Sequence, residues 1–231
     1  MADGIVLPES VDGHAGTHAK PALFRRRLII MVKEPVAGRV KTRLARDVGS
    51  ATALRVYRAN MAAVVRRLAN DERWQTVLSV APAPAVARRH LPPQLPRVAQ
   101  STGDIGARMQ AALSAPLGPR PAAGPVVLIG SDVPTVRPAH IAEAFRLLGR
   151  NDFVFGPAAD GGFWLIGQRR TPLIRDAFPR PVAWSSPSTL ADCLDALAHA
   201  GVGIVDTLSD MDAAADLVRL GASSGRVILP R

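Results

Sequence analysis

Short apolar runs alternate along this sequence with longer segments of helical periodicity. Runs of four or five mostly apolar residues are typical of buried strands, and segments whose apolar residues recur every three or four positions are typical of helices. The three clearest strand and helix pairs are Leu28–Val32 with Ala51–Leu68, Val77–Ala81 with Ala85–Leu91, and Val126–Ile129 with Ala139–Leu148. This alternation predicts βαβ units and a largely parallel sheet with helices on its faces, so the predicted fold class is α/β.

Three further elements are predicted downstream of these pairs. A helix is expected to begin near Ser186, because serine caps helices and the proline after it suits a first helical turn, and Gly201 ends this helix. A short strand follows at Val202–Val205. Asp212 is placed to cap a last helix that runs to Leu220.

The sequence predicts one domain with a short appendage. Residues 1–27 show no periodicity and lack the charged and apolar segments of a secretion signal, so we expect a flexible N-terminal extension. No repeat or long linker divides residues 28–231, which are expected to form a single domain. The apolar runs are too short to cross a bilayer, and Cys193 is the single cysteine. A cytoplasmic protein without disulfides is therefore predicted.

A basic stretch, VKEPVAGRVKTRLAR at residues 32–46, follows the first predicted strand. Ligands of open α/β sheets bind outside the carboxyl ends of the strands, where Gly38 would let backbone amides approach a phosphate group. The residues of this stretch that are predicted to bind a nucleotide are Lys33, Gly38, Arg39, Lys41 and Arg43. The stretch matches neither the G-x-G-x-x-G pattern nor a P-loop. Taken alone, it is equally compatible with a solvated basic loop.

Two aspartates follow later apolar runs. Asp132 lies just beyond Val126–Ile129 in GSDVP, and Asp160 lies in a glycine turn in GPAADGGFWLIG. Hard divalent cations bind one or two carboxylates together with phosphate oxygens, so the pair predicts a site for Mg²⁺, or Mn²⁺, against a diphosphate. Lys41, Asp132 and Asp160 are the predicted catalytic residues. Either aspartate alone is more typical of a turn.

Six motifs stand in the order expected of a known family: MVKEPVAGRVKTRLA, STGDIGARM, GSDVPTV, GPAADGGFWLIG, AWSSPSTL and DTLSDMDAAADL. Over roughly residues 28–220 the chain resembles a family of small bacterial transferases, long classed as a domain of unknown function and labelled in places as arsenosugar biosynthesis glycosyltransferases. It is more distantly similar to the molybdenum-cofactor and phospholactate guanylyltransferases.

The resemblance implies a nucleotide-diphospho-sugar transferase fold, which is GT-A-like and Rossmann-like. This fold is a three-layer sandwich around a mostly parallel sheet, and it would carry a Mg²⁺-assisted nucleotide site. The departures from the family pattern are Trp164 in place of tyrosine and Met211-Asp212-Ala213 in place of Val-Asp-Thr. Neither departure affects the two aspartates predicted to bind metal.

The segment QSTGDIGARMQAAL, residues 100–113, has two interpretations. Asp104 is placed to cap the helix that follows it. In the family that the chain resembles, this segment faces the nucleotide, which adds Gly103, Asp104 and Arg108 to the predicted nucleotide-binding residues. The residues predicted to face the acceptor are Gly161, Gly162 and Trp184. For this tryptophan, packing in the core is more typical than stacking on a sugar.

Two transferase functions fit these residues. The favoured one is glycosyl transfer from a nucleotide-diphospho-sugar to a small acceptor, with Asp132 and the basic stretch stabilising the leaving nucleoside diphosphate. The alternative is nucleotidyl transfer, in which the same residues stabilise attack by a phosphorylated small molecule on a nucleoside triphosphate. Both predict an enzyme whose partners are a nucleotide or nucleotide sugar and a small-molecule acceptor, and a homodimer is compatible with either.

A third function, from another class, is a non-catalytic binder of polyanions or nucleic acid. The formal net charge of +10 suggests it. The basic residues are scattered, however, and aromatic residues make up only 4% of the chain, so stacking platforms for bases are scarce. Nucleic acid is therefore not favoured as a partner.

Overall fold

The structure of the protein is a computed structural model that describes residues 26–88, 91–92, 94–115, 124–170 and 173–211. Within these ranges, seven strands form one sheet. The strands are β1 (Arg27–Lys33), β2 (Gln75–Ala81), β3 (Arg97–Ala99), β4 (Val126–Gly130), β5 (Phe153–Pro157), β6 (Phe163–Gln168) and β7 (Val202–Ile204). The helices are α1 (Thr42–Val48), α2 (Ser50–Ala69), α3 (Ile105–Ser114), α4 (Pro138–Leu147) and α5 (Thr189–Ala196).

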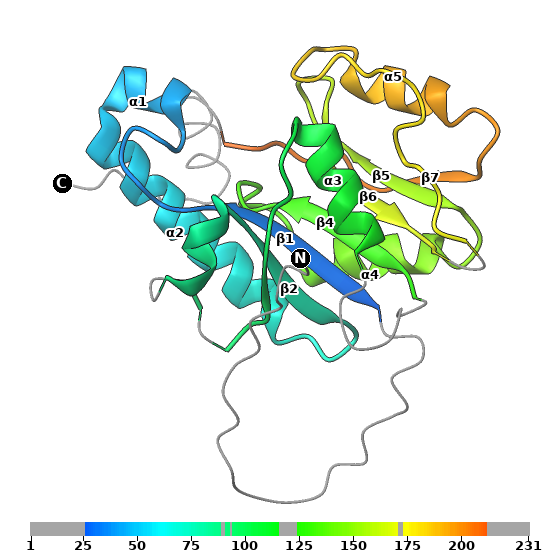
Figure 1. Ribbon diagram of the computed structural model, residues 1–231, viewed down its shortest axis with the longest axis horizontal. Helices are drawn as coiled ribbons and strands as arrows, with labels where there is room; N and C mark the ends of the chain where they lie inside the picture. Colours follow the sequence, from blue (N-terminus) through cyan, green and yellow to red (C-terminus); the bar gives the residue numbers. More distant parts are fainter. Residues whose placement is uncertain (1–25, 89–90, 93, 116–123, 171–172, 212–231) are drawn as a thin grey trace, which may run out of the picture.

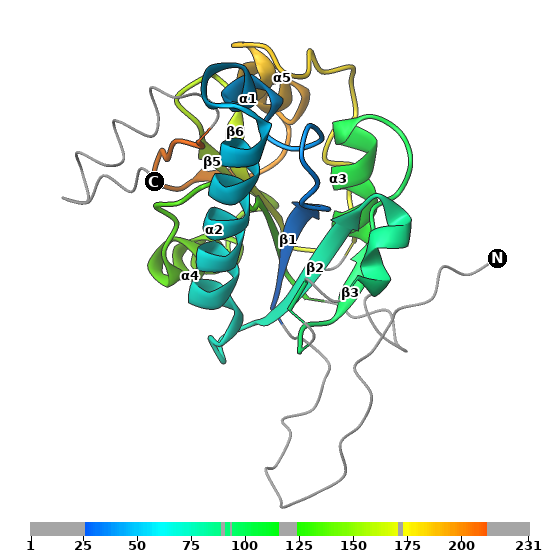
Figure 2. The same ribbon diagram turned by 90° about the vertical axis from the view of Figure 1, so that its left-hand side faces the viewer.

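The sheet has the strand order β3-β2-β1-β4-β6-β5-β7; Figure 1 labels every strand except β3, which is labelled beside β2 in Figure 2. β6 runs antiparallel to both of its neighbours, and the other strand pairs are parallel. The mostly parallel α/β sheet predicted from the alternating pattern is therefore confirmed. The order of the strands reverses between β1 and β4, and such a reversal leaves a crevice at the carboxyl ends of the two strands.

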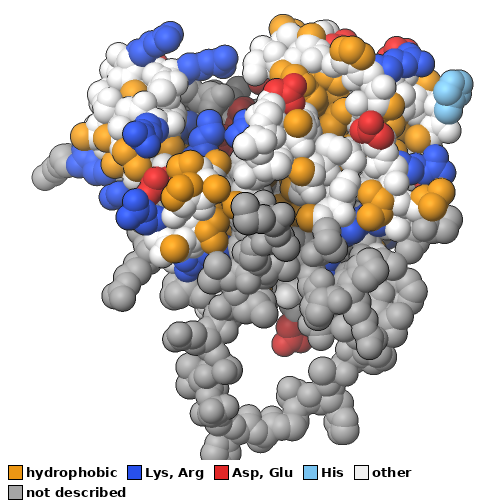
Figure 3. All heavy atoms as spheres, viewed as in Figure 1, with side chains coloured by type: hydrophobic (Ala, Val, Ile, Leu, Met, Phe, Trp, Pro, Cys, Tyr) orange, Lys and Arg blue, Asp and Glu red, His pale blue; other side chains and the backbone are white. Residues whose placement is uncertain are grey.

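Helices cover both faces of the sheet and give the molecule three layers. α2 and α4 lie on one face and α3 on the other, as the side view in Figure 2 shows. α5 joins α3, because buried residues of both helices belong to the same apolar cluster. Lys and Arg side chains gather over the region of α1, on the left of the view in Figure 3.

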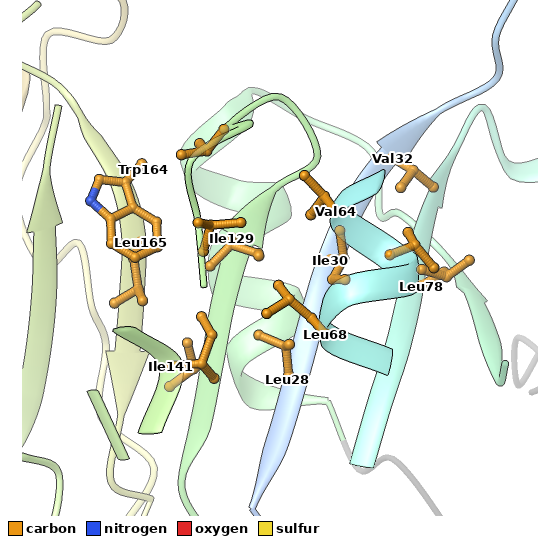
Figure 4. Close-up of a cluster of buried hydrophobic side chains, with 14 of the residues drawn as sticks. Leu28, Ile30, Val32, Val64, Leu68, Leu78, Ile129, Ile141, Trp164 and Leu165 are labelled. Atoms are coloured by element: carbon orange, nitrogen blue, oxygen red, sulfur yellow. The ribbon is translucent and has the colours of Figure 1, made fainter. Parts of the chain in front are cut away.

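Alternation along β1 divides the core between the two faces. Leu28, Ile30 and Val32 contribute to the cluster beneath α2 and α4, and Figure 4 shows them close to Val64 and Leu68 of α2. Successive strand residues point to opposite faces. Ile29 accordingly joins the second cluster, beneath α3 and α5. Both faces of the central strand are therefore buried, as expected for a parallel sheet.

Most of the predicted elements are present, and one prediction is wrong. A short 3-10 helix at Ala83–Ala87 stands where a longer helix was predicted over Ala85–Leu91. Pro82 and Pro84 lack amide donors, and this shortage limits the segment to a single turn. α5 begins at Thr189, two residues after Pro187.

Two elements were not predicted, α1 and β3. Leu44 is the one buried residue of α1, so this helix has no apolar periodicity to reveal it. β3 has only three residues. The helix predicted from Asp212 to Leu220 lies outside the described residues. In the described part of the chain, no helix has the length and apolar character needed to span a membrane.

Candidate active site

A cleft opens at the carboxyl ends of β1 and β4, where the strand order reverses. Met31 pairs with Gly130, so Lys33 and Asp132 each lie two residues beyond a matched pair at the strand ends. The cleft consists of two adjoining hollows of about 490 and 550 Å³ that share several lining residues, among them Arg43 and Asp132. The predicted basic stretch and the first predicted aspartate therefore meet at one place.

The two hollows differ in charge. We call the smaller one the basic half; its charged lining residues in the described part of the chain are Lys33, Lys41, Arg43, Arg108 and Asp132. We call the larger one the acidic half; the corresponding residues there are Arg43, Asp132, Asp160 and Asp210. Arg43 and Asp132 line both hollows, so the boundary between the hollows separates three cationic side chains, Lys33, Lys41 and Arg108, from two carboxylates, Asp160 and Asp210.

Lys41 forms an ion pair with Asp132 inside the basic half. Its Nζ lies 2.8 Å from Asp132 Oδ2, and only 6% of the lysine side chain is exposed. The backbone of Lys41 is in the left-handed conformation, with φ 48° and ψ 48°, at the position that precedes α1. Residues other than glycine seldom adopt this conformation, and such strained residues gather at functional sites.

Gly130 allows the Asp132 carboxylate to fold back against β4. A Cβ atom added at Gly130 would lie 2.6 Å from Asp132 Oδ1, a separation that real Cβ atoms do not show. The backbone of Asp132 is also held, because its carbonyl accepts a hydrogen bond from the Met211 amide at 3.1 Å. A glycine at the end of the strand is therefore part of what positions this carboxylate.

Asp160 combines a turn-forming contact with a place in the acidic half. Its Oδ1 accepts a hydrogen bond from the Gly162 amide at 3.0 Å, the contact expected of an aspartate that shapes a turn. The same residue is exposed and lines the hollow that Asp132 also lines. Both of its predicted roles, in the turn and at the site, are compatible with this position.

The single tyrosine of the chain connects β1 and β4 beneath the cleft, and the sequence analysis did not identify it. Tyr57 Oη accepts a hydrogen bond from the Lys33 amide at 2.8 Å and donates one to the Lys33 carbonyl at 3.0 Å. It also lies 3.4 Å from Ser131 Oγ. One turn further along α2, Asn60 Nδ2 donates to the Ser131 carbonyl at 3.3 Å. α2 thus fixes the ends of both strands through buried polar groups.

Burial raises the pKa of Tyr57, and the nearby Asp132 charge raises it further. The hydrogen bonds to Ser131 and Lys33 act in the opposite direction on this pKa. The phenol therefore remains protonated at neutral pH and keeps its bond to the Lys33 carbonyl. A polar pair at positions i and i+3 within an otherwise apolar helix face was the signal that could have revealed these residues.

Gln100, also missed from the sequence, positions Arg108. Its Nε2 donates to the carbonyls of Val32 and Ser79, at 3.3 and 2.9 Å, which fixes it to the ends of β1 and β2. Its Oε1 accepts a hydrogen bond from Arg108 Nη1 at 3.2 Å. The predicted nucleotide-binding arginine is thus directed into the basic half by a side chain that is itself held by the sheet.

Other predicted site residues have contacts of a structural kind. Asp104 caps α3, since its carboxylate accepts a hydrogen bond from the Ala107 amide at 2.8 Å. Gly161, at φ 86°, packs against the backbone of Pro187, and Gly162 lines the acidic half. Trp184 lines the acidic half as well, but its ring also packs edge-on against Phe178. The residues that line neither hollow are Gly38, Arg39, Gly103, Asp104 and Gly161.

The residues of the cleft fit a hard divalent cation. The Asp132 carboxylate already accommodates a cation, the ammonium group of Lys41, and Asp160 lines the same hollow. Mg²⁺ and Mn²⁺ typically use one or two carboxylates together with phosphate oxygens of the substrate rather than an all-protein cage. No cluster of three or more His, Cys, Asp and Glu residues suited to a metal occurs in the described part of the chain.

Comparison with known proteins identifies the family. The sequence profile described as "Uncharacterized protein conserved in bacteria (DUF2064)" matches residues 64–186, more than half of the chain. The chain belongs to this family. No curated protein matches it. A crystal structure from Desulfovibrio desulfuricans G20, provisionally named a nucleotide-diphospho-sugar transferase, is similar at 28% identity and a TM-score of 0.77, over 87% of this chain and 88% of that one.

More distant structures share the fold of this DUF2064 family member. The 4-diphosphocytidyl-2C-methyl-D-erythritol synthase of Anaerococcus prevotii has a TM-score of 0.55 at 12% identity, over 88% of this chain and 99% of that one. Glucosyl-3-phosphoglycerate synthase of Mycobacterium tuberculosis, solved with Mn²⁺, uridine diphosphate and phosphoglyceric acid, has a TM-score of 0.51 at 13% identity, over 89% and 76% of the two chains. The resemblance and the fold inferred from the motifs are both confirmed.

We predict that Gly130→Ala impairs the site without unfolding the protein. The added methyl group must displace the Asp132 carboxylate, because the two would otherwise overlap. Affinity for Mn²⁺ in the presence of a nucleoside diphosphate should fall about tenfold or more, as expected when a charge-assisted contact is lost. Gly201→Ala is the matched control, since a Cβ there meets no atom closer than 3.5 Å. Equal Mn²⁺ affinity in both variants, measured by electron paramagnetic resonance, would contradict the role assigned to Gly130.

Proposed function

We propose that the protein is a divalent-metal-dependent transferase that moves a glycosyl group from a nucleotide-diphospho-sugar to a small-molecule acceptor. The observation that carries this proposal is the division of the cleft into a basic and an acidic half that meet at Asp132. A nucleoside diphosphate matches the basic half in charge, and the sugar attached to it would reach the boundary. The fold and the DUF2064 membership are compatible with this chemistry.

The charge of the acidic half favours glycosyl transfer over nucleotidyl transfer. In the nucleotidyl-transfer alternative the acceptor carries a phosphate group, and the exposed Asp160 carboxylate would repel it. Arg43 is the one cationic side chain among the described lining residues of this half, and it also lines the basic half. A neutral, hydroxyl-bearing acceptor meets no such repulsion, and the rings of Phe163, Trp164 and Trp184 offer it apolar surface.

The basic half would stabilise the leaving group. Lys33, Lys41, Arg43 and Arg108 would hold the two phosphates of the donor, and their hydrogen bonds strengthen as negative charge develops on the departing diphosphate. A Mg²⁺ or Mn²⁺ ion held by Asp132 would supply further neutralisation of that charge. Because Lys41 already pairs with Asp132, its ammonium lies beside the position where the charge would appear.

The acidic half would orient and activate the acceptor. Asp160 is exposed at the hollow, with its Oδ1 held by the Gly162 amide, so the carboxylate is fixed relative to the bound acceptor. A carboxylate in this place can accept the proton of an attacking hydroxyl group. Such an enzyme is expected in the cytoplasm, where a chain with a single cysteine stays reduced.

Product analysis tests the reaction type. The protein is incubated with Mg²⁺, or Mn²⁺, and a panel of nucleotide sugars and nucleoside triphosphates, with and without small acceptors bearing hydroxyl or phosphate groups. Release of nucleoside diphosphate from a nucleotide sugar is expected. Release of pyrophosphate from a nucleoside triphosphate with a phosphorylated acceptor would instead establish nucleotidyl transfer, and binding of nucleic acid without turnover would support the polyanion binder.

Substitutions in the basic half should weaken nucleotide binding. Lys41→Met and Arg43→Met keep the apolar part of each side chain and remove the charge. Each lost charge-assisted bond is worth roughly 1.5–3 kcal/mol, so each variant should bind a nucleoside diphosphate about tenfold to a hundredfold more weakly at saturating Mg²⁺. The control is Arg46→Met, which lies in α1 with Arg43 but outside both hollows. The affinities are measured by titration calorimetry. If all three variants bind the nucleoside diphosphate as tightly as the parent, the basic stretch is a solvated loop and not a nucleotide site.

Substitution of the two aspartates separates their roles. Asp132→Asn should abolish metal-dependent nucleotide binding, because asparagine keeps the size of the side chain but removes the charge that a divalent cation needs. If Asp160 also holds the cation, Asp160→Asn should do the same. If Asp160 serves the acceptor, its variant should bind metal and nucleotide normally but lose turnover. A Mg²⁺ titration with nucleotide present distinguishes these cases, and normal binding by Asp132→Asn would rule out the proposed site.

A further inference from the structure

A second cluster of charge lies at the opposite end of the central strands from the cleft. β1 begins at Arg27, which pairs with Val126 of β4, and Val126 pairs in turn with Gln168 at the end of β6. Arg170 follows Gln168 by two residues. β1 and β6 therefore bring Arg27 and Arg170 to the same end of the sheet, the end away from the cleft. By alternation, Arg27 shares the face of Ile29, the face covered by α3 and α5.

Both arginines are buried, and much of their hydrogen-bonding capacity is unused. Arg27 is 6% exposed and Arg170 is 4% exposed. In each guanidinium group, Nε and Nη1 are buried and have no hydrogen-bond partner among the described residues. Buried polar groups are almost always hydrogen-bonded, and an uncompensated buried charge is costly. Gln168 Oε1 is the one buried side-chain acceptor of the described residues that is also unpaired, so the four unpaired donor nitrogens at this end of the strands outnumber it and call for a further acceptor.

The surroundings supply only part of the compensation. Arg170 Nη2 donates to the carbonyls of Ser114 and Ala115, at 3.3 and 3.2 Å, and so lies against the C-terminal end of α3. The partial negative charge of a helix end amounts to about half an elementary charge. The Asp152 carboxylate, directly before β5, accepts hydrogen bonds from Arg169 Nη2 at 2.6 Å and from the Gly201 amide at 3.1 Å.

The two positive charges also act on each other. Burial lowers the pKa of Arg27, and the charge of Arg170 lowers it further; burial likewise lowers the pKa of Arg170. Arg170 is moreover held with φ 62°, the left-handed conformation that residues other than glycine seldom adopt. Two buried positive charges thus repel each other. An anion bound between or beside them would offset this repulsion.

We propose that Arg27 and Arg170 form a binding site for a small oxyanion of the size of phosphate or sulfate. The unused donors of each arginine are Nε and Nη1, which point to different sides of the guanidinium group, so an ion would accept single N–H donors from both arginines rather than the fork of one. The burial of both side chains limits the ligand to a small ion. The site is distinct from the nucleotide cleft, because neither arginine lines either hollow, and it does not depend on the proposed transferase reaction.

The test uses the full chain carrying Lys41→Met and Arg43→Met, so that phosphate binding in the cleft is weakened. Thermal unfolding is followed against inorganic phosphate at constant ionic strength, with chloride as the balancing ion, and bound phosphate is counted by equilibrium dialysis. We expect a saturable rise in Tm of roughly 2–5 °C and one phosphate per chain. Arg27→Met in this background should abolish both effects. The matched control is Arg180→Met, which removes an exposed arginine paired with Asp195 and should change neither.

A second variant keeps the test decisive if Arg27→Met fails to fold. Arg27→Lys retains the positive charge but replaces the planar guanidinium donors with one ammonium group on a shorter polar end, so phosphate should bind at least about tenfold more weakly while the protein still folds. Either of two results would overturn the proposal. One is that dialysis of the Lys41→Met, Arg43→Met chain finds no bound phosphate. The other is that phosphate raises the Tm of this chain equally with and without Arg27→Lys or Arg180→Met. An absence of bound phosphate is also the result expected if a carboxylate of the chain itself pairs with the two arginines.

Discussion

The parallel pairing of β1 with β4 is the constraint on which the cleft depends. The register places Met31 opposite Gly130, so the chain leaves both strands at the same level and turns into the cleft from both sides. The basic stretch follows one strand, and Asp132 follows the other. Lys41 and Asp132, 91 residues apart in the sequence, meet at 2.8 Å as a consequence. Tyr57 and Asn60 of α2 then fix the two strand ends from below.

An arginine contacts each end of α3. Near its beginning, Arg108 is directed into the basic half by Gln100. At its other end, the carbonyls of Ser114 and Ala115 accept hydrogen bonds from the buried Arg170. A helix of this length spans about 15 Å. One helix thus contacts both the candidate active-site cleft and the proposed oxyanion site.

Apolar periodicity was sufficient to predict the fold class, the long helices and the strands other than the three-residue β3. α2 and α4 were predicted within two residues, because each has one apolar face. α1 was missed because only Leu44 of its residues is buried, and the helix predicted over Ala85–Leu91 failed because proline removes the donors that a longer helix needs. The conformation of these two segments depends on local backbone preferences, which apolar periodicity does not indicate.

The site was predictable where chemistry shows in residue type, and less so where it depends on contacts. Charged side chains after strands indicated Lys41, Asp132 and Asp160, all of which line the cleft. Tyr57 and Gln100 carry no charge, and their roles arise from backbone groups of distant strands that only the folded chain brings near. The strained backbone of Lys41 likewise leaves no mark in the sequence.

A crystal structure with Mn²⁺ and a nucleoside diphosphate would test the central claim most directly, namely that the charge-divided cleft is a metal-assisted nucleotide site. The account predicts an anomalous Mn²⁺ signal beside the Asp132 carboxylate. It also predicts that the diphosphate lies in the basic half and that Lys41 Nζ has moved from Asp132 to a phosphate oxygen. A nucleotide bound elsewhere, or a Lys41–Asp132 pair that stays intact with no metal beside it, would contradict the account.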